Sequence, residues 1–322
     1  MPELITFASR QPATYIRGEV FDEVVSDSAT MLAKANLANW DVRLRPIETD
    51  ARAMTEAFEV IRTNPFDGGI DRLGISGERY AEIQNETVFG MFDHLGVEWE
   101  AAGQFKGGTI VYGQCVTDRT IVVDPTGAAD EVKPFVVVST GHGGKGALRI
   151  GRSAMRMDCM NMFNLVFGKQ LQHAITIRHT KSANERIKEI IRAWKANNAY
   201  FDAVEAEANA LFQQAATDRQ FFSIVEQFMG ERPEENTKGA QTKWDNNRDL
   251  YAEAWNGSTN EKAKGTAWGV FNALIERNQW GRIEQKTDNG PDNFAMAGMG
   301  LDNVTNAFRQ RAYEAAKSLV TV

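Results

Sequence analysis

Between residues 104 and 150, short runs of β-branched and apolar residues stand between turn residues. The runs are 109–116, 120–123 and 135–140, and a Pro-Thr-Gly turn at 125–127 separates the last two. Connections this short join antiparallel neighbours in a sheet. The pattern therefore predicts an antiparallel β-meander in this part of the chain.

A long stretch with helical spacing follows the predicted strands. Ser182 and Glu185 match a capping box, and apolar residues recur at three- and four-residue spacing from Ile187 to Leu211. A helix of roughly thirty residues is about 45 Å long and can back a whole sheet. Because the apolar face of the sheet needs a cover, we predict an α+β fold in which the meander packs against this helix.

Other segments complete the predicted organisation. Helical spacing favours helices at 51–63, 81–95, 266–276 and 302–317, whereas 230–265 has the composition of a linker interrupted by aromatic residues. These patterns divide the chain into an N-terminal mixed region at 1–103, a sheet-and-helix core at 104–229, and a C-terminal helical region at 230–322.

The composition is that of an ordinary globular protein. The 322 residues are 43% hydrophobic, and no apolar run reaches the length of a membrane span. The N-terminus lacks the basic start and apolar stretch of a secretion signal, and the two cysteines, Cys115 and Cys159, form no disulfide framework. We therefore expect a cytoplasmic protein with no membrane partner.

Charge is distributed unevenly along the chain. Residues 141–200, here called the basic segment, contain eleven Lys and Arg residues but only three acidic residues, so the segment carries a net charge of +8. Because the formal net charge of the whole chain is −7, the remaining residues carry −15. This asymmetry is typical of a protein that meets a polyanion with one face, although a basic helix face solvated by water is an equally simple interpretation.

The candidate nucleic-acid-binding residues come from this segment. Four of them, from Lys145 to Arg156, lie on or beside the last predicted strand at positions where several can share one face. The full set is Lys145, Arg149, Arg152, Arg156, Lys169, Arg178, His179 and Lys181.

Two motifs suggest other chemistry. Gly141-His-Gly-Gly-Lys-Gly146 is similar to a phosphate loop, but Ser139 and Gly146 replace the glycine and the Ser or Thr that the nucleotide-binding pattern requires. A glycine-rich turn between two strands explains it better, although such a turn can still contact a phosphate through its amides. Asp124 with Glu131 and Lys133 is similar to a metal-dependent nuclease site. A charged turn is the better interpretation, because we expect Glu131 and Lys133 to lie outside the sheet.

Three segments indicate a family. Arg156-Met-Asp-Cys-Met-Asn161, then Ile177-Arg-His-Thr180, and later Gly265-Thr-Ala-Trp268 with Asn272-Ala273 resemble the motifs of a phage/plasmid-like protein family called domain of unknown function 932. The resemblance covers most of residues 70–320. We expect Arg156, Cys159 and Asn161 to form a structural junction rather than a catalytic centre, with Cys159 as a small buried side chain.

The predicted order of hairpin, further strands and long helix also resembles the core of phage single-strand annealing proteins, which form rings that hold DNA by its phosphates. The resemblance implies a homo-oligomer that binds and anneals single-stranded DNA without nucleotide hydrolysis, catalytic residues, metal or cofactor. Two alternatives remain: a non-enzymatic phage structural or host-interaction protein, and a metal-dependent nuclease.

Overall fold

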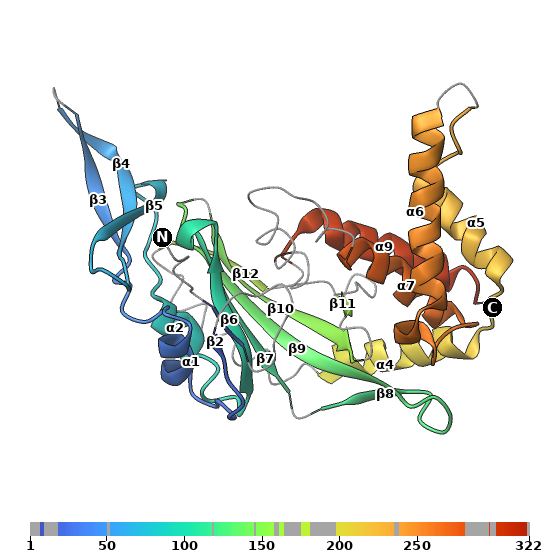
Figure 1. The fold of residues 1–322 in the computed structure, drawn as a ribbon. Helices are drawn as coiled ribbons and strands as arrows, with labels where there is room; N and C mark the ends of the chain where they lie inside the picture. The colour runs from blue at the N-terminus through green and yellow to red at the C-terminus, as the bar shows by residue number, and fades with distance from the viewer. Residues whose placement is uncertain are drawn as a thin grey trace. The chain divides into compact units, whose positions relative to one another are not determined.

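The computed structural model describes most of the chain, and Figure 1 shows its fold. The described residues are 7–9, 19–49, 52–117, 119–144, 146–157, 161–163, 175–180, 198–234, 238–280, 296 and 301–320. They fall into two compact units. Unit 1 takes those within Met1–Arg119, Phe135–Arg152 and Gln172–Asn198, and unit 2 takes those within Thr120–Pro134, Ser153–Leu171 and Ala199–Val322. This division differs from the three consecutive regions expected from the sequence, because two long strands each contribute residues to both units.

Unit 1 is built on an antiparallel sheet. Its strand order is β10-β9-β7-β6-β1-β2, with β12 also paired to β10. Among the described pairs, the short β1–β2 pair is parallel, whereas β1–β6, β6–β7, β7–β9 and β10–β12 are antiparallel. The bounds are β1 Phe7–Ser9, β2 Glu19–Val20, β6 Glu98–Phe105, β7 Ile110–Val116, β9 Asp130–Gly141, β10 Ala147–Arg156 and β12 Ile175–Arg178. The predicted strands at 109–116 and 135–140 are thereby confirmed. Strand β9 starts five residues earlier than expected, so Glu131 and Lys133 lie within the sheet, and the prediction that they lie outside it is wrong.

A second sheet in unit 1 contains β3 Arg43–Thr49, β4 Arg52–Thr63 and β5 Ile70–Gly77 in that order. The prediction of a helix at 51–63 is wrong, since these residues form β4. A register shift between Val60 and Ile61 marks a bulge, and both side chains are buried although they are consecutive. A bulge breaks the two-residue alternation of a strand, which explains why the apolar spacing matched a helix.

Two short helices complete unit 1: α1 Ser28–Lys34 and α2 Asn85–Gly90. Helix α2 covers only part of the helix predicted at 81–95. Aromatic packing fixes its position, because the Phe89 ring stacks on Trp99 of β6 with ring centroids 4.8 Å apart. Both rings are fully buried in the core of the unit.

Unit 2 combines short strands with helices. Strand β8 Ile121–Val123 pairs with residues 130–132 of β9, and β11 Asn161–Phe163 pairs with residues 154–156 of β10. Helix α4 Asn198–Gln213 belongs to the same hydrophobic cluster as residues of β8, β9 and β10. It forms the C-terminal half of the long helix predicted from Ser182. Residues 181–197, including the predicted capping box, lie outside the described residues.

Helix α7 Ala267–Trp280 belongs to the helical part of unit 2. The others are α5 Asp218–Met229, α6 Lys238–Asn256 and α9 Asn303–Lys317, and the η2 turn spans Ser258–Asn260. Residues 267–275 of α7 are all buried, as expected for a helix with neighbours on every side. Figure 1 shows α6 and α9 next to it. The helices predicted at 266–276 and 302–317 are confirmed.

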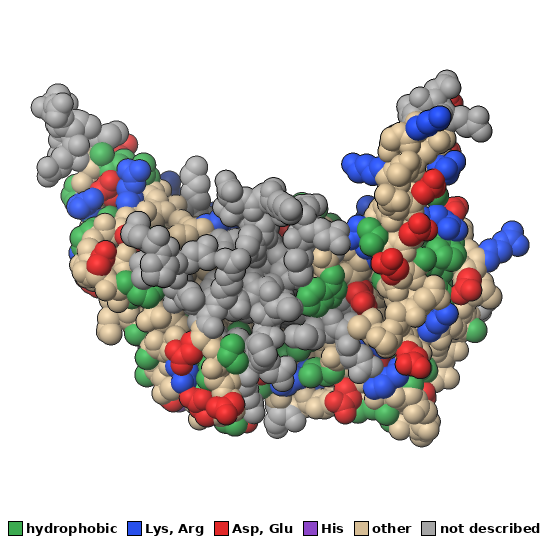
Figure 2. Space-filling view, in the orientation of Figure 1, with side chains coloured by type: hydrophobic (Ala, Val, Ile, Leu, Met, Phe, Trp, Pro, Cys, Tyr) green, Lys and Arg blue, Asp and Glu red, His purple; other side chains and the backbone are tan. Residues whose placement is uncertain are grey.

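Helix α6 corrects the interpretation of 230–265 as linker-like. Nineteen residues of this stretch are helical, but only Tyr251, Ala254 and Trp255 are buried. Figure 2 shows basic and acidic side chains interspersed over α5 and α6. A helix with so few apolar contacts carries a polar sequence, which is why its composition resembled a linker.

The predicted α+β class, with an antiparallel sheet and additional C-terminal helices, is confirmed. No helix in the described ranges has both the length and the apolar character to cross a bilayer.

Candidate nucleic-acid interface

A polar cleft of about 840 Å³ opens in unit 1 where the end of β5 meets β10 and β12. Three arginines, two glutamates and several small or backbone-exposing residues line it. They are Glu56, Gly77, Glu78, Arg79, Tyr80, Gly144, Gly146, Ala147, Arg149, Thr176, Arg178, His179 and Thr180.

Strand pairing brings two of the predicted residues to this cleft. Arg149 lies opposite Thr176, and Ala147 lies opposite Arg178. Successive side chains of a strand alternate between faces, so Arg149 and Arg178 share one face as diagonal neighbours. The opposite face carries the buried Leu148 and contributes to the core. Both arginines are exposed on the solvent face.

Arg79 is the third arginine of the cleft, and no sequence motif marks it. It is exposed just beyond the end of β5. In the described part of the chain, no carboxylate lies within ion-pair distance of Arg79, Arg149 or Arg178. Their charges therefore remain available to an anion, although Glu56 and Glu78 in the lining reduce the net positive charge of the cleft to one.

The glycine loop between β9 and β10 forms one wall, and close backbone packing explains its glycines. A Cβ on Gly144 would lie 2.1 Å from the carbonyl oxygen of Ile75, and a Cβ on Gly74 would lie 2.4 Å from that of Gly143. Gly144 also has a φ of +79°, which disfavours other residues. The loop is thus a glycine-rich turn joining two strands, as the sequence indicates. Lys145 lies outside the described residues.

Two buried histidines lie in unit 1, and one lines the floor of the cleft. His179 Nε2 is 3.1 Å from Thr140 Oγ1, and its ring stacks on Tyr80. His142 Nε2 is 2.9 Å from Asn85 Oδ1. Burial lowers the pKa of His179 to about 4 and that of His142 to about 3, the latter with help from His179 and Arg62. Both are neutral at pH 7, so His179 brings no positive charge to the cleft that it lines.

Arg156 is removed from the candidate surface because it is completely buried in unit 2. Its Nε donates to Asp130 Oδ2 at 2.6 Å, and its Nη1 donates to the carbonyl of Thr259 at 2.6 Å. Arg149 and Arg156 differ by seven positions, an odd number, and therefore point to opposite sides of β10.

The buried carboxylate of Asp130 joins two segments of the family motif. Trp268 Nε1 donates to the same Oδ2 atom at 2.8 Å, so Arg156 and Trp268 converge on one oxygen. Asn161 pairs directly with Arg156 in the β10–β11 ladder. These contacts fit the expected structural junction at Arg156 and Asn161, whereas Cys159 lies outside the described residues. No sequence motif includes Asp130, whereas its neighbour Glu131 belongs to the nuclease-like set.

Of the remaining candidate nucleic-acid-binding residues, one is described by the structure and two are not. Arg152 is half-buried on β10 and interacts with other groups. Lys169 and Lys181 lie outside the described residues.

The nuclease motif does not assemble a metal site. Asp124 is a turn residue, because its Oδ2 accepts from the amide of Ala128. Glu131 is exposed on β9, whereas the adjacent Asp130 is buried on the other face. Over the described ranges, no three His, Cys, Asp or Glu residues come together in an arrangement suited to a metal ion.

Fold and site together define a class: an α+β protein with an arginine-lined cleft on the exposed side of an antiparallel sheet. The chain belongs to the family described as Domain of unknown function (DUF932), whose model matches residues 72–311. No curated protein and no solved structure matches it.

Proposed function

We propose that the protein binds single-stranded nucleic acid through the cleft of unit 1 and promotes pairing of complementary strands without nucleotide hydrolysis. The observation that carries the proposal is the set of exposed arginines at 79, 149 and 178, none of which has an ion-pair partner among the described residues. Guanidinium groups bind phosphates in a bidentate manner. Contacts to the phosphates give affinity that does not depend on base sequence and leave the bases free to pair.

Two of the three arginines that line the cleft belong to the basic segment. These are Arg149 and Arg178, and Arg79 joins them from a different strand end. A structural or host-interaction protein would use the same arginines as a protein-binding patch. The salt dependence of binding to single-stranded DNA distinguishes the two, because contacts to phosphates weaken steeply as salt rises.

The test is a titration of the purified protein with single-stranded oligonucleotides at several salt concentrations. We expect Arg149→Gln and Arg178→Gln to weaken binding to all sequences by a similar factor. Each variant is expected to reduce the slope of log affinity against log salt by about 0.7, the value for one phosphate contact on a single strand. Strand pairing is measured by the rate at which complementary oligonucleotides form a duplex.

Arg72→Gln is the matched control. Arg72 is an exposed arginine of unit 1 that does not line the cleft, and it sits 3.4 Å from Glu59. We expect it to leave affinity and slope unchanged. If the folded cleft variants bind as tightly as the parent, or the parent does not bind at low salt, the interaction-protein alternative becomes the better account.

The proposed function also implies an origin, a place of action and an oligomeric state for the protein. We infer a phage or plasmid origin, action in a bacterial cytoplasm, and assembly into a homo-oligomer, since annealing proteins with a similar order of elements form rings. Sedimentation of the protein with and without oligonucleotide tests the assembly. A monomer under both conditions contradicts it.

A further inference from the structure

A second cavity, of about 760 Å³, lies in unit 2 along one side of α6. Its lining also includes the end of α5, the residues that follow it, and one residue of α7. These residues are Met229, Pro233, Gly239, Ala240, Thr242, Lys243, Trp244, Asn246, Asn247, Leu250 and Arg277. The volume is that of a pocket for a small organic ligand.

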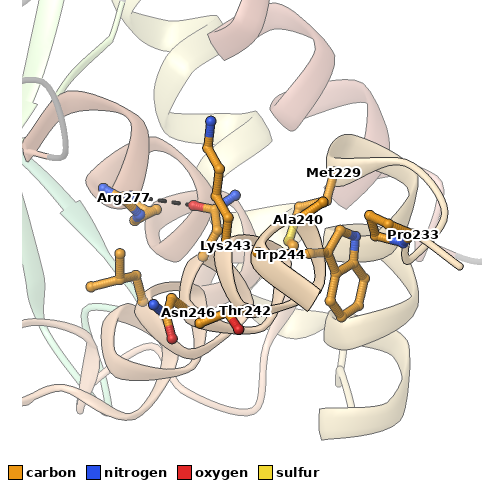
Figure 3. Close-up of a pocket in the computed structure, with 11 residues that line it drawn as sticks. Met229, Pro233, Ala240, Thr242, Lys243, Trp244, Asn246 and Arg277 are labelled. Carbon is orange, nitrogen blue, oxygen red and sulfur yellow. Dashed lines mark hydrogen bonds between the residues drawn. The ribbon is translucent and has the colours of Figure 1, made fainter. Parts of the chain in front are cut away.

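One end of the cavity is an aromatic platform. The indole N–H of Trp244 donates to the carbonyl of Gly230 at 3.0 Å, which fixes the orientation of the ring. The Trp244 side chain is only half-buried, and Met229 and Pro233 lie beside it (Figure 3). A fixed and partly exposed indole offers a flat surface on which another planar ring can stack.

The other end is cationic and rich in amides. Arg277 Nη2 donates to Asn247 Oδ1 at 3.2 Å, as Figure 3 shows. Its Nε is buried and has no hydrogen-bond partner within the described ranges. Lys243 is exposed, and the lining contains no Asp or Glu. This end therefore attracts an anion, in contrast to the mixed charges over the rest of α5 and α6.

We propose that this cavity binds a nucleotide, with the base stacked on Trp244 and the phosphate held by Lys243 and Arg277. Inorganic phosphate would make no use of the indole, and an apolar ligand would make no use of the two cations. A planar ring joined to a phosphate uses both, and the amides of Asn246 and Asn247 can bond to the polar edge of a base. The same chemistry is supplied by a free nucleoside monophosphate or by one unit of a single strand.

This site is independent of the proposed cleft, because all its residues belong to unit 2 and those of the cleft belong to unit 1. If the cleft does not bind nucleic acid, the cavity can still bind a nucleotide, and the reverse is also true. Variants at Arg149 and Arg178 test the cleft, and variants at Trp244 and Lys243 test the cavity.

The experiment is equilibrium dialysis of the full chain against AMP and, separately, against a short labelled oligothymidylate. We expect Trp244→Leu to weaken binding by roughly 5- to 100-fold, the range for loss of one base–aromatic stack. Lys243→Gln is expected to weaken it less and to reduce the salt dependence. If Trp244→Leu weakens binding of both probes, the cavity is a site for free nucleotides. If it weakens binding of the oligonucleotide alone, the cavity is a site for one nucleotide of a single strand.

Two further variants distinguish stacking from structural damage. Trp244→Phe keeps an aromatic face and is expected to recover most of the affinity lost in Trp244→Leu. Lys238→Gln removes an exposed positive charge from the same helix outside the cavity, and is expected to change nothing. Thermal unfolding of each variant is compared with the parent.

The proposal is overturned if neither probe loses affinity in folded Trp244→Leu. It is equally overturned if the cavity binds a labelled acidic peptide but not AMP or the oligonucleotide, since that result assigns the surface to a protein partner.

Discussion

Arg149 and Arg156 stand on the same strand, seven residues apart, yet their surroundings are opposite. Arg149 is exposed at the cleft of unit 1, with no ion-pair partner among the described residues. Arg156 is fully buried in unit 2, where Asp130 and Thr259 bind its guanidinium. Both contribute equally to the +8 of the basic segment.

The difference shows that the net charge of a segment counts together arginines that stabilise the fold and arginines that can bind a ligand. A buried arginine is neutralised by its partner and stabilises one arrangement of the chain, since leaving either charge unpaired is costly. An exposed arginine contributes little to stability and keeps its charge for a ligand. Binding and stability should therefore respond to different members of the same segment.

The largest expected effect comes from breaking the buried pair. Arg156→Met leaves the Asp130 carboxylate without its cation, and we expect a loss of about 3–5 kcal/mol in the free energy of unfolding. Urea denaturation measures it. Arg149→Met on the same strand is the control and should change the free energy of unfolding by less than about 0.5 kcal/mol. Equal losses in the two variants would contradict the comparison.

Acid should destabilise unit 1 through its buried histidines. Both have folded-state pKa values below the ordinary value of 6.5, so the unfolded state binds more protons as the pH falls. The contribution of these histidines to the free energy of unfolding is therefore complete above pH 6.5 and decreases toward pH 4. For His179 the decrease is on the order of 3 kcal/mol.

Denaturation midpoints between pH 7 and 4 test this prediction. His179→Gln should make the denaturation midpoint depend less on pH. His94→Gln is the control, because His94 is an exposed histidine of the same unit, and it should not have this effect. An unchanged pH dependence in His179→Gln would show that other groups cause the acid sensitivity.

Trp268 contributes one hydrogen bond to the buried carboxylate. Trp268→Phe removes the indole N–H that donates to Asp130 but leaves Arg156 in place, so we expect a loss of about 1.5–3 kcal/mol, smaller than for Arg156→Met. Denaturation in urea gives the value. A larger loss than for Arg156→Met would mean that ring packing outweighs the ion pair.

The smallest effect is expected at an exposed pair of the same residue types. Arg232 binds Asp245 through two hydrogen bonds of 2.8 and 2.6 Å, but each side chain is nearly half exposed. Water and salt screen such a pair. Arg232→Met should therefore leave the denaturation midpoint close to that of the parent. A shift as large as that of Arg156→Met would show that burial is not what separates the two pairs.

Local patterns in the sequence determined the mixed fold class, the strands β7, β8 and β9 of the large sheet, and the helices at 266–276 and 302–317. These elements follow from periodicity and turn residues, which act over a few neighbours. The same local signal failed at β4, where a bulge made a strand resemble a helix, and at α6, where a polar helix resembled a linker.

The candidate site depended more on the tertiary structure. The sequence identified Arg149 and Arg178, but only strand pairing showed that they share an exposed face, and only the fold brought Arg79 beside them. It also brought Arg156 and Trp268 to the carboxylate of Asp130, which lies 26 and 138 positions away from them along the chain. Charge is a property of each residue, whereas burial and pairing arise from contacts between distant segments, and these decide which charges a ligand can reach.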